Sequence, residues 1–396
     1  MQTMIALQTD QDSQTMTSPS DTGGEDKTIT ALIHVLSWLH PRDLASLACT
    51  CSALNTASAV VNSARAKDLT RGLERFPVPA INDIDRPLYP IFAYSPFPVL
   101  RSLPALLPWR SDPEKSGRKL SSESFDVCPR SRPTNRCCPC SDYHFLPRQS
   151  HAISSTDGSL SSRETDSPAS KRYKSLAPLC GHLPGGKLIY DENSRLNIIS
   201  NEHYHWQDFL LIMECGSACS CSINCKYRVT QRGLNIKVAV YRDALKGWSL
   251  QAMEHIPKGT FMFEYAGELL TTLEARRRQK QYDELRASNK NFVSSLIVMR
   301  EHLPSGNVCL RLNIDATHVG NVARFVNHSC DGGNLQPCLV RLSGSMIPKL
   351  AFFASCDITE GDELTFSYGD ECDVSKAHEC FCKTASCKGF LPFEET

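Results

Sequence analysis

Closely spaced cysteines constrain the fold of this chain more than any other feature, since 19 of its 396 residues are cysteine. In a secreted protein they would indicate disulfides, but secretion requires a signal peptide. The first 27 residues are polar, rich in Gln, Thr, Ser and Asp, and lack the apolar core of such a signal. We therefore expect a disordered leader over residues 1–27, a reducing compartment, and thiolates that bind zinc.

Charge and hydropathy narrow the class of protein. The chain has 43 Lys and Arg against 43 Asp and Glu, so its formal net charge is zero. This balance excludes a generally polybasic nucleic-acid wrapper, and we expect no sequence-specific nucleic-acid binding. No apolar run approaches the ~20 residues of a membrane helix, so we expect no membrane partner. The length and the 41% hydrophobic content suit two or three folded units.

Nine cysteines in the middle of the chain have the spacing of metal ligands. The dense group, in the pattern C-x3-C-x-C-x3-C, consists of Cys215, Cys219, Cys221 and Cys225. The looser upstream group consists of Cys128, Cys137, Cys138, Cys140 and Cys180. Nine thiolates can satisfy up to three tetrahedral zinc ions if three of the thiolates bridge. A Ser-rich segment at about 141–176 divides the upstream group, and its composition predicts a disordered insertion.

A third group near the C-terminus comprises Cys380, Cys382 and Cys387. Three thiolates leave a tetrahedral zinc one ligand short, so a cysteine from elsewhere in the chain must supply the fourth. The candidates are Cys330, Cys338, Cys356 and Cys372. Isolated cysteines are more often small buried hydrophobes than ligands, which is our expectation for Cys49, Cys51, Cys309, Cys338 and Cys356.

The half of the chain that begins at Leu234 is dense in predicted strands. Runs such as IKVAVYR, GWSLQAM and TFMFEYAGELL are rich in β-branched and aromatic residues. One long helix is predicted, because Thr271 and Glu274 form a capping box ahead of a charged stretch that ends at Arg286. A short helix is predicted over Val319 to Val326. Many short strands and few helices predict an antiparallel, β-rich α+β fold.

Four short motifs in this half carry candidate functional residues. In order they are Lys246-Gly247-Trp248, Glu264-Tyr265-x-Gly267-Glu268, the run RFVNHSC from Arg324 to Cys330, and the run ELTFSYG from Glu363 to Gly369. The glycine in the first motif lets backbone approach a ligand. Each motif alone is a weak signal, but all four in this order, between cysteine groups of zinc type, are highly specific.

These motifs resemble those of the SET-domain protein lysine methyltransferases, in particular the suppressor-of-variegation branch and its plant suppressor-of-variegation-related group. The most similar segments are EYAGELLTTLEARRRQ, IDATHVGNVARFVNHSCDGGNL and ELTFSYGD. The resemblance implies a SET β-clip fold with knotted C-terminal motifs, flanked by zinc-binding segments. It implies a pre-SET region at 76–233, a SET domain at 234–369 and a post-SET segment at 370–396.

The resemblance also implies an activity and a site. The enzyme would be an S-adenosylmethionine-dependent histone-lysine methyltransferase, with Tyr368 and Tyr265 as catalytic residues and Phe366 leaving room for di- and trimethyl-lysine. Cys330 would complete the post-SET zinc site. The cofactor would be held by Lys246, Gly247, Trp248, Tyr265, Arg324, Asn327, His328 and Phe390. Ser367 departs from the branch, which commonly has Asp there.

The substrate that the resemblance implies is the histone H3 tail, at the lysine in position nine. That activity would place the protein in the nucleus on repressive chromatin. Two alternatives remain open: a methyltransferase of a non-histone protein, and an inert SET scaffold.

Residues 28–70 form a separate predicted unit. Leu32, Val35, Leu36 and Leu39 recur at helical spacing before Pro41 interrupts the run, and the pattern then resumes. A helical hairpin of this length buries little apolar area alone. The segment is similar to the F-box pattern, which would dock a Skp-type ubiquitin-ligase adaptor. The alternative is a helical cap that packs on the catalytic half or on another protein.

Overall fold

The computed structural model describes seven stretches of the chain: 30–100, 188–197, 210–289, 292–302, 309–345, 347–369 and 378–392. The chain forms two compact units, the first ending at Ala64 and the second beginning at Arg65. The predicted leader, the Ser-rich insertion, the five upstream cysteines and Cys372 lie outside the described residues. None of the described helices combines the length and apolarity that crossing a membrane requires.

The first unit is a small helical domain. Residues 30–36 are helical, and α2 (Pro41–Ala48) and α3 (Ser52–Lys67) follow. The predicted break at Pro41 is the first turn of α2, where a proline's missing N–H costs nothing, and the His40 side chain caps this helix. Its buried core consists of Leu36, Leu44, Ala57 and Val61. Contrary to expectation, Cys49 and Cys51 are exposed.

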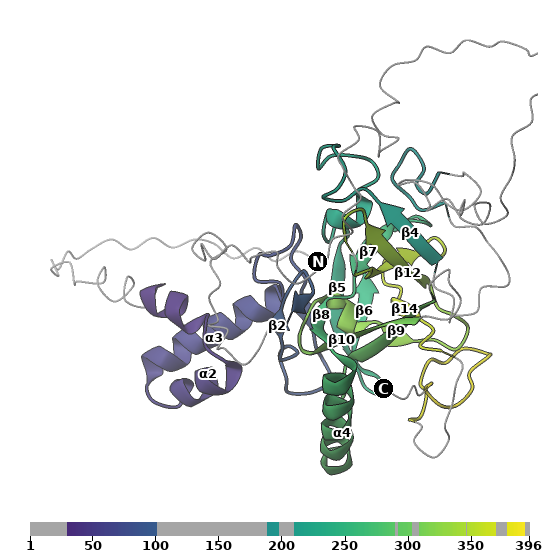
Figure 1. The fold of residues 1–396 in the computed structure, drawn as a ribbon. Coiled ribbons are helices and arrows are strands. Elements are labelled where there is room, and N and C mark those ends of the chain that lie inside the picture. The colour runs from purple at the N-terminus through teal and green to yellow at the C-terminus, as the bar shows by residue number, and fades with distance from the viewer. Residues whose placement is uncertain are drawn as a thin grey trace, which may run out of the picture. The chain divides into compact units, whose positions relative to one another are not determined.

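The second unit is built from small sheets (Figure 1). One sheet joins β1 (Ala80–Ile81), β5 (Val238–Asp243) and β6 (Gly247–Ala252). Another has the order β4 (Leu210–Glu214), β12 (Leu335–Leu342), β13 (Lys349–Ala354) and β7 (Phe261–Glu264). The largest joins β2 (Ala93–Tyr94), β10 (Cys309–Gly320), β8 (Gly267–Leu270) and β3 (Val99–Leu100), with β9 (Leu296–His302) also paired to β10.

The direction of pairing separates two groups of strands. Strands that lie next to each other in sequence, such as β5 with β6 and β12 with β13, pair antiparallel, as predicted. The four strands described upstream of residue 234, which are β1, β2, β3 and β4, pair in parallel with strands of the C-terminal half. The sheets are therefore mixed, because the upstream segments join their edges from a distance in sequence.

The two predicted helices are present with different lengths. Helix α4 (Thr272–Ser288) extends away from the sheets (Figure 1), and the Thr271 side chain accepts a hydrogen bond from the N–H of Glu274, as the capping box predicted. The second is only a 3-10 turn, η3 (Val322–Phe325). The expected start at Val319 was wrong because β10 continues to Gly320 and Asn321 caps the turn.

A short parallel pair, β11 (Asn327–His328) with β14 (Thr365–Phe366), joins two of the predicted motifs. The chain that leaves β11 then passes directly against β14. At Gly333, whose φ is +71°, a Cβ atom would lie 2.3 Å from the carbonyl oxygen of Thr365, so only glycine fits. This close approach fixes the segment that contains the functional side chains.

Candidate active site and metal centre

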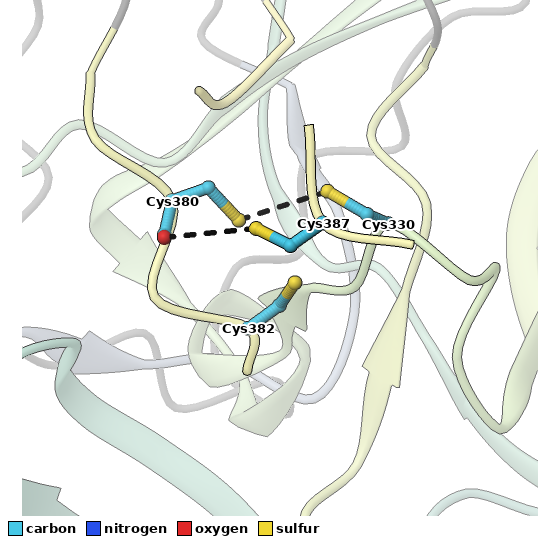
Figure 2. Close-up of side chains that lie close together, drawn as sticks. All are labelled: Cys330, Cys380, Cys382 and Cys387. Atoms are coloured by element: carbon cyan, nitrogen blue, oxygen red, sulfur yellow. Dashed lines mark hydrogen bonds between the residues drawn. The ribbon is translucent and has the colours of Figure 1, made fainter. Parts of the chain in front are cut away.

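Four cysteines that are distant in sequence converge at the end of β11. The Sγ atoms of Cys330, Cys380, Cys382 and Cys387 all lie within 4.8 Å of one another, and Figure 2 shows the four side chains pointing toward a common centre. Four thiolates in this arrangement suit tetrahedral Zn²⁺. The structure thus selects Cys330 from the candidates for the missing ligand. Cys338 is fully buried, as expected of a small hydrophobe, whereas Cys356 is exposed, contrary to expectation.

The electrostatics of this cluster favour metal binding. Burial alone would raise the pKa of the Cys382 thiol, but hydrogen bonds from the Thr384 side chain and backbone outweigh it and lower the pKa to about 6. Burial raises the pKa of Cys330. The Cys382 thiol is therefore the one that ionises most readily, and the charge of a bound metal would favour ionisation of the others.

The dense group upstream brings three of its four members together. Within the described residues, Cys215, Cys221 and Cys225 have Sγ atoms within 4.8 Å of one another, and Cys219 is not in this set. The guanidinium of Arg228 donates to the carbonyl oxygens of Gly216 (2.7 Å) and Cys221 (3.3 Å). Burial alone would raise the pKa of the Cys221 thiol, but the hydrogen bond from Arg228 and contacts with the neighbouring thiols lower it, whereas burial raises the pKa of Cys225. Three ligands leave a zinc ion at this position open to a fourth.

Tyr265, Phe366 and Tyr368 belong to one packed aromatic group, in which the ring of Phe352 lies 6.5 Å from that of Tyr265 and 4.9 Å from that of Phe366. The rings of Phe366 and Tyr368 lie 4.9 Å apart. The hydroxyl of Tyr368 donates to the carbonyl oxygen of Val326 (2.7 Å), and the hydroxyl of Tyr265 donates to that of Ser295 (2.9 Å). Burial raises the pKa of Tyr265, and desolvation also raises that of Tyr368, which is 39% exposed as a whole although its hydroxyl lies against the Val326 carbonyl. Both hydroxyls are therefore protonated donors at neutral pH.

A charged cluster connects β6, β11 and the last motif. The ammonium of Lys246 lies 2.5 Å from a carboxylate oxygen of Glu363. The Asn327 amide donates to the other oxygen of that carboxylate (3.0 Å) and to the hydroxyl of Ser249 (2.7 Å). Glu363 is thus the centre of the cluster, although sequence reasoning did not assign it a role. Its only signal was its place as the first residue of the ELTFSYG motif.

Arg324 has a different environment from the one expected of a cofactor ligand. Its guanidinium donates to the carbonyl oxygens of Ala316 (2.8 Å) and Thr317 (3.1 Å). The same group lies 4.8 Å from the ring centroids of both Phe92 and Phe325. Burial lowers its pKa to about 10. These contacts join η3 to β10 and to the segment that precedes β2.

Of the remaining predicted cofactor residues, His328 lies in β11, and the others lie in β6 and in the C-terminal segment. Gly247, with φ +85°, and Trp248 open β6, and the guanidinium of Arg242 lies 5.4 Å from the Trp248 ring. Phe390 forms an isolated β-bridge with Glu379, next to Cys380, and is 39% exposed. Both aromatic side chains are partly open to solvent.

Comparisons with known proteins agree with this architecture. The SET domain family model matches residues 247–369. The chain is 40% identical over 369 residues to histone-lysine N-methyltransferase SUVR3 of Arabidopsis thaliana, a match that covers 91% of this chain and 90% of the relative. It is 36% identical over 220 residues to histone-lysine N-methyltransferase SETMAR of Mus musculus, covering 52% of this chain and 67% of the relative.

Solved structures show the same fold. The methyltransferase domain of human SETMAR superposes with a TM-score of 0.53 at 27% identity, covering 83% of this chain and 99% of that domain. Arabidopsis thaliana SUVH6 in complex with SAM superposes with a TM-score of 0.52 at 23% identity, covering 82% of this chain and 55% of that protein. The second likeness is one of fold.

The metal content of the purified chain tests the C-terminal ligand set. Cys330→Ser should remove about one zinc per chain, because a tetrahedral site that loses a thiolate binds the ion far more weakly. The matched control is Cys356→Ser, since Cys356 is exposed and belongs to neither cysteine cluster. Elemental analysis of the full chain measures the zinc content. An equal zinc content in the two variants would contradict the assignment of Cys330 as a ligand. In the wild type, roughly four zinc per chain would mean a complete upstream cluster, and about two an incomplete one.

Proposed function

Because the chain belongs to the SET-domain histone-lysine N-methyltransferases of suppressor-of-variegation type, we propose that it methylates the lysine at position nine of the histone H3 tail. The products would be di- and trimethyl-lysine. The observation that carries this proposal is the packed group of Tyr265, Phe366 and Tyr368 next to a charged cluster and a four-cysteine zinc set. The crystal structure of KRYPTONITE with an H3(1–15) peptide, which shares the fold at a TM-score of 0.50, is consistent with such a substrate.

Within this proposal residues 76–233 form the pre-SET region, 234–369 the SET domain and 370–396 the post-SET segment. S-adenosylmethionine supplies an electrophilic methyl group on a sulfonium. The residues that would hold it are Lys246, Gly247, Trp248, Tyr265, Asn327, His328, Phe390 and, through its backbone, Arg324. The fit rests on the charged cluster around Glu363, which offers both signs of charge to an amino-acid group, and on the partly buried ring of Trp248.

The protein's own contribution to methyl transfer is alignment and the exclusion of water. The attacking lysine must be neutral, and desolvation among aromatic rings lowers the pKa of an amine, so no strong base is obligatory. The Tyr265 and Tyr368 hydroxyls donate their protons to backbone carbonyls, so each oxygen remains as an acceptor that can orient the N–H groups of the attacking amine. Phe366 contributes a ring without a hydroxyl, which leaves space for a methylated amine.

The substrate has a sheet edge beside this site. Among the described strands, β9 pairs only with β10, and we propose that an extended peptide adds along its other edge. The strand begins at Leu296, directly after Ser295, whose carbonyl oxygen accepts the Tyr265 hydroxyl. A peptide added along β9 would therefore pass the proposed catalytic tyrosine. Action on H3 would place the protein in the nucleus, on repressive chromatin.

A second proposal concerns the N-terminal unit, which we propose docks a Skp-type ubiquitin-ligase adaptor. Its helices leave Val35 (64% exposed) and Trp38 (55% exposed) on the surface, while Leu36 and Leu44 are buried in its core. Large apolar side chains exposed on a unit with so small a core favour a partner surface. The alternative is a helical cap that packs on the catalytic half or on another protein.

Methyl transfer to histone H3 should depend on Tyr368. We expect the full chain to label an H3 tail peptide from radioactive S-adenosylmethionine, and substitution of the peptide's ninth lysine by arginine to abolish the label. Tyr368→Phe should lower kcat by about 100-fold, since it removes an oriented hydroxyl from the site. Tyr89→Phe is the matched control, because its hydroxyl accepts a hydrogen bond from Arg65, outside the site. No label on any histone from the wild type would favour the inert scaffold.

The product should be set by residue 366. The wild type is expected to give di- and trimethyl-lysine, and Phe366→Tyr to stop mainly at monomethyl-lysine, because the added hydroxyl occupies the space and can hold a water. Mass spectrometry of an H3 peptide over a time course distinguishes the two. Wild-type protein that makes only monomethyl-lysine would contradict the proposal.

Adaptor binding should depend on the exposed apolar side chains of the first unit. Val35→Asp and Trp38→Asp should each weaken capture by an immobilised Skp-type adaptor by at least about tenfold, as expected when a charge enters an apolar contact. Leu36→Asp and Leu44→Asp are unsuitable, because they would place a charge in the core. Thr56→Asp, at an exposed position of α3, is the control. Undiminished capture in both variants would favour the cap.

A further inference from the structure

His328 lies between the metal centre and the proposed catalytic tyrosine. It is the second residue of β11 and is only 5% exposed. Its Nδ1 atom lies 3.1 Å from the backbone nitrogen of Tyr368. Its Nε2 atom lies 3.1 Å from the Sγ atom of Cys330. One imidazole therefore touches both a metal ligand and the backbone of the tyrosine.

The two contacts require one tautomer of the ring. A backbone N–H is always a donor, so Nδ1 of His328 must accept from Tyr368. In the neutral ring the proton then sits on Nε2, which points at Cys330. A zinc-bound thiolate accepts such a hydrogen bond, and donors of this kind orient metal ligands. Both nitrogens of the imidazole are thus engaged within the protein.

The contact with Tyr368 comes where the strand ladder has ended. Strand β14 stops at Phe366, whose carbonyl oxygen still accepts from the N–H of Ser329 (3.0 Å). Tyr368 lies two residues further, and its N–H takes the ring of His328 as acceptor. The two rings lie 5.3 Å apart. The imidazole therefore continues the pairing of the two segments beyond their backbone ladder.

We propose that His328 is a positioning residue that couples occupancy of the C-terminal zinc site to the placement of Tyr368. One nitrogen holds the backbone of Tyr368 and the other holds the Cys330 thiolate. The inference rests on the proposed role of Tyr368 in methyl transfer. It assigns the side chain of His328 to this coupling and leaves contact with the cofactor to its backbone. Zinc release would loosen the ring and, through it, the tyrosine.

Two substitutions distinguish the contact made by Nε2 of His328 with Cys330 from the contact made by Nδ1 with Tyr368. The amide of His328→Gln can place a donor near the position of Nε2 and has no acceptor at Nδ1. His328→Asn offers an acceptor near Nδ1 and cannot reach Cys330. We expect His328→Gln to release zinc to a competing chelator at a rate close to the wild type, and His328→Asn to release it about tenfold faster.

Hydrogen exchange of the Tyr368 backbone amide tests its contact with Nδ1 of His328 without any enzymatic assay. In His328→Gln this amide should exchange about fivefold faster, because it loses its acceptor. In zinc-loaded His328→Asn it should stay protected. Removal of zinc from the wild type should also make the Tyr368 amide exchange faster. That result would show directly that zinc occupancy affects the placement of Tyr368. The amides of β12 and β13 serve as the internal reference for global folding.

Thr384→Val is the matched control for the contact between His328 and the zinc ligand Cys330. The Thr384 hydroxyl lies 3.2 Å from the Sγ atom of Cys382, a different ligand of the same set. This variant should release zinc faster while the Tyr368 amide stays protected as long as zinc is bound. Faster exchange at Tyr368 in zinc-loaded Thr384→Val would overturn the proposal, because any weakening of the site would then act on the tyrosine without His328.

Kinetics of the full chain complete the test. His328→Gln should lower kcat about tenfold and leave the KM for S-adenosylmethionine within about threefold, and its effect should vanish in a Tyr368→Phe background. A dominant effect on KM, or unchanged zinc release in His328→Asn, would overturn the positioning role. If the wild type transfers no methyl group, the proposed function fails, and the zinc and exchange measurements still decide the coupling.

Discussion

The parallel pairing of Asn327 with Thr365 and of His328 with Phe366 is the contact on which the whole site depends. Parallel strands run in the same direction, so the chain leaves both at the same end. Cys330 and Tyr368 each follow two residues after their strand, and the pairing therefore delivers a metal ligand and the proposed catalytic hydroxyl to one place. An antiparallel pair would send them to opposite ends. A ladder this short is weak alone, so further contacts must support it.

Those parts of the fold that depend on neighbours in sequence were predictable. The capping residue of α4 and the antiparallel pair of β5 with β6 follow from local spacing and alternation. The parallel pairing of β1, β2, β3 and β4 with the C-terminal half was not predictable. Three of these strands have only two residues, too few to show an alternation of apolar and polar side chains. Their partners are chosen by the edges that the C-terminal half leaves open, and that information is not local.

The site divides in the same way. Ligand counting required a fourth thiolate for the C-terminal zinc, and the structure supplies it as Cys330, the residue that the family resemblance indicated. Spacing alone did not show that Cys219 lies outside its cluster or that Arg324 is occupied by backbone carbonyls and aromatic rings. Glu363 was missed because a carboxylate in a strand motif is ordinarily predicted to be an exposed surface residue. Only the structure shows that Lys246 and Asn327 lie beside it.

The electrostatics of the tyrosines limit how the proposed reaction can proceed. Desolvation raises the pKa of both the buried Tyr265 and the partly exposed Tyr368, so neither phenol is a base at neutral pH. The proton on the incoming lysine must then leave to solvent before the amine is sealed in, and the aromatic surroundings must hold the amine neutral afterwards. The formal net charge of the chain is zero, so a basic peptide must be attracted by local carboxylates. Positioning of the hydroxyls, and therefore the backbone contacts that fix them, remains the protein's main contribution to the rate.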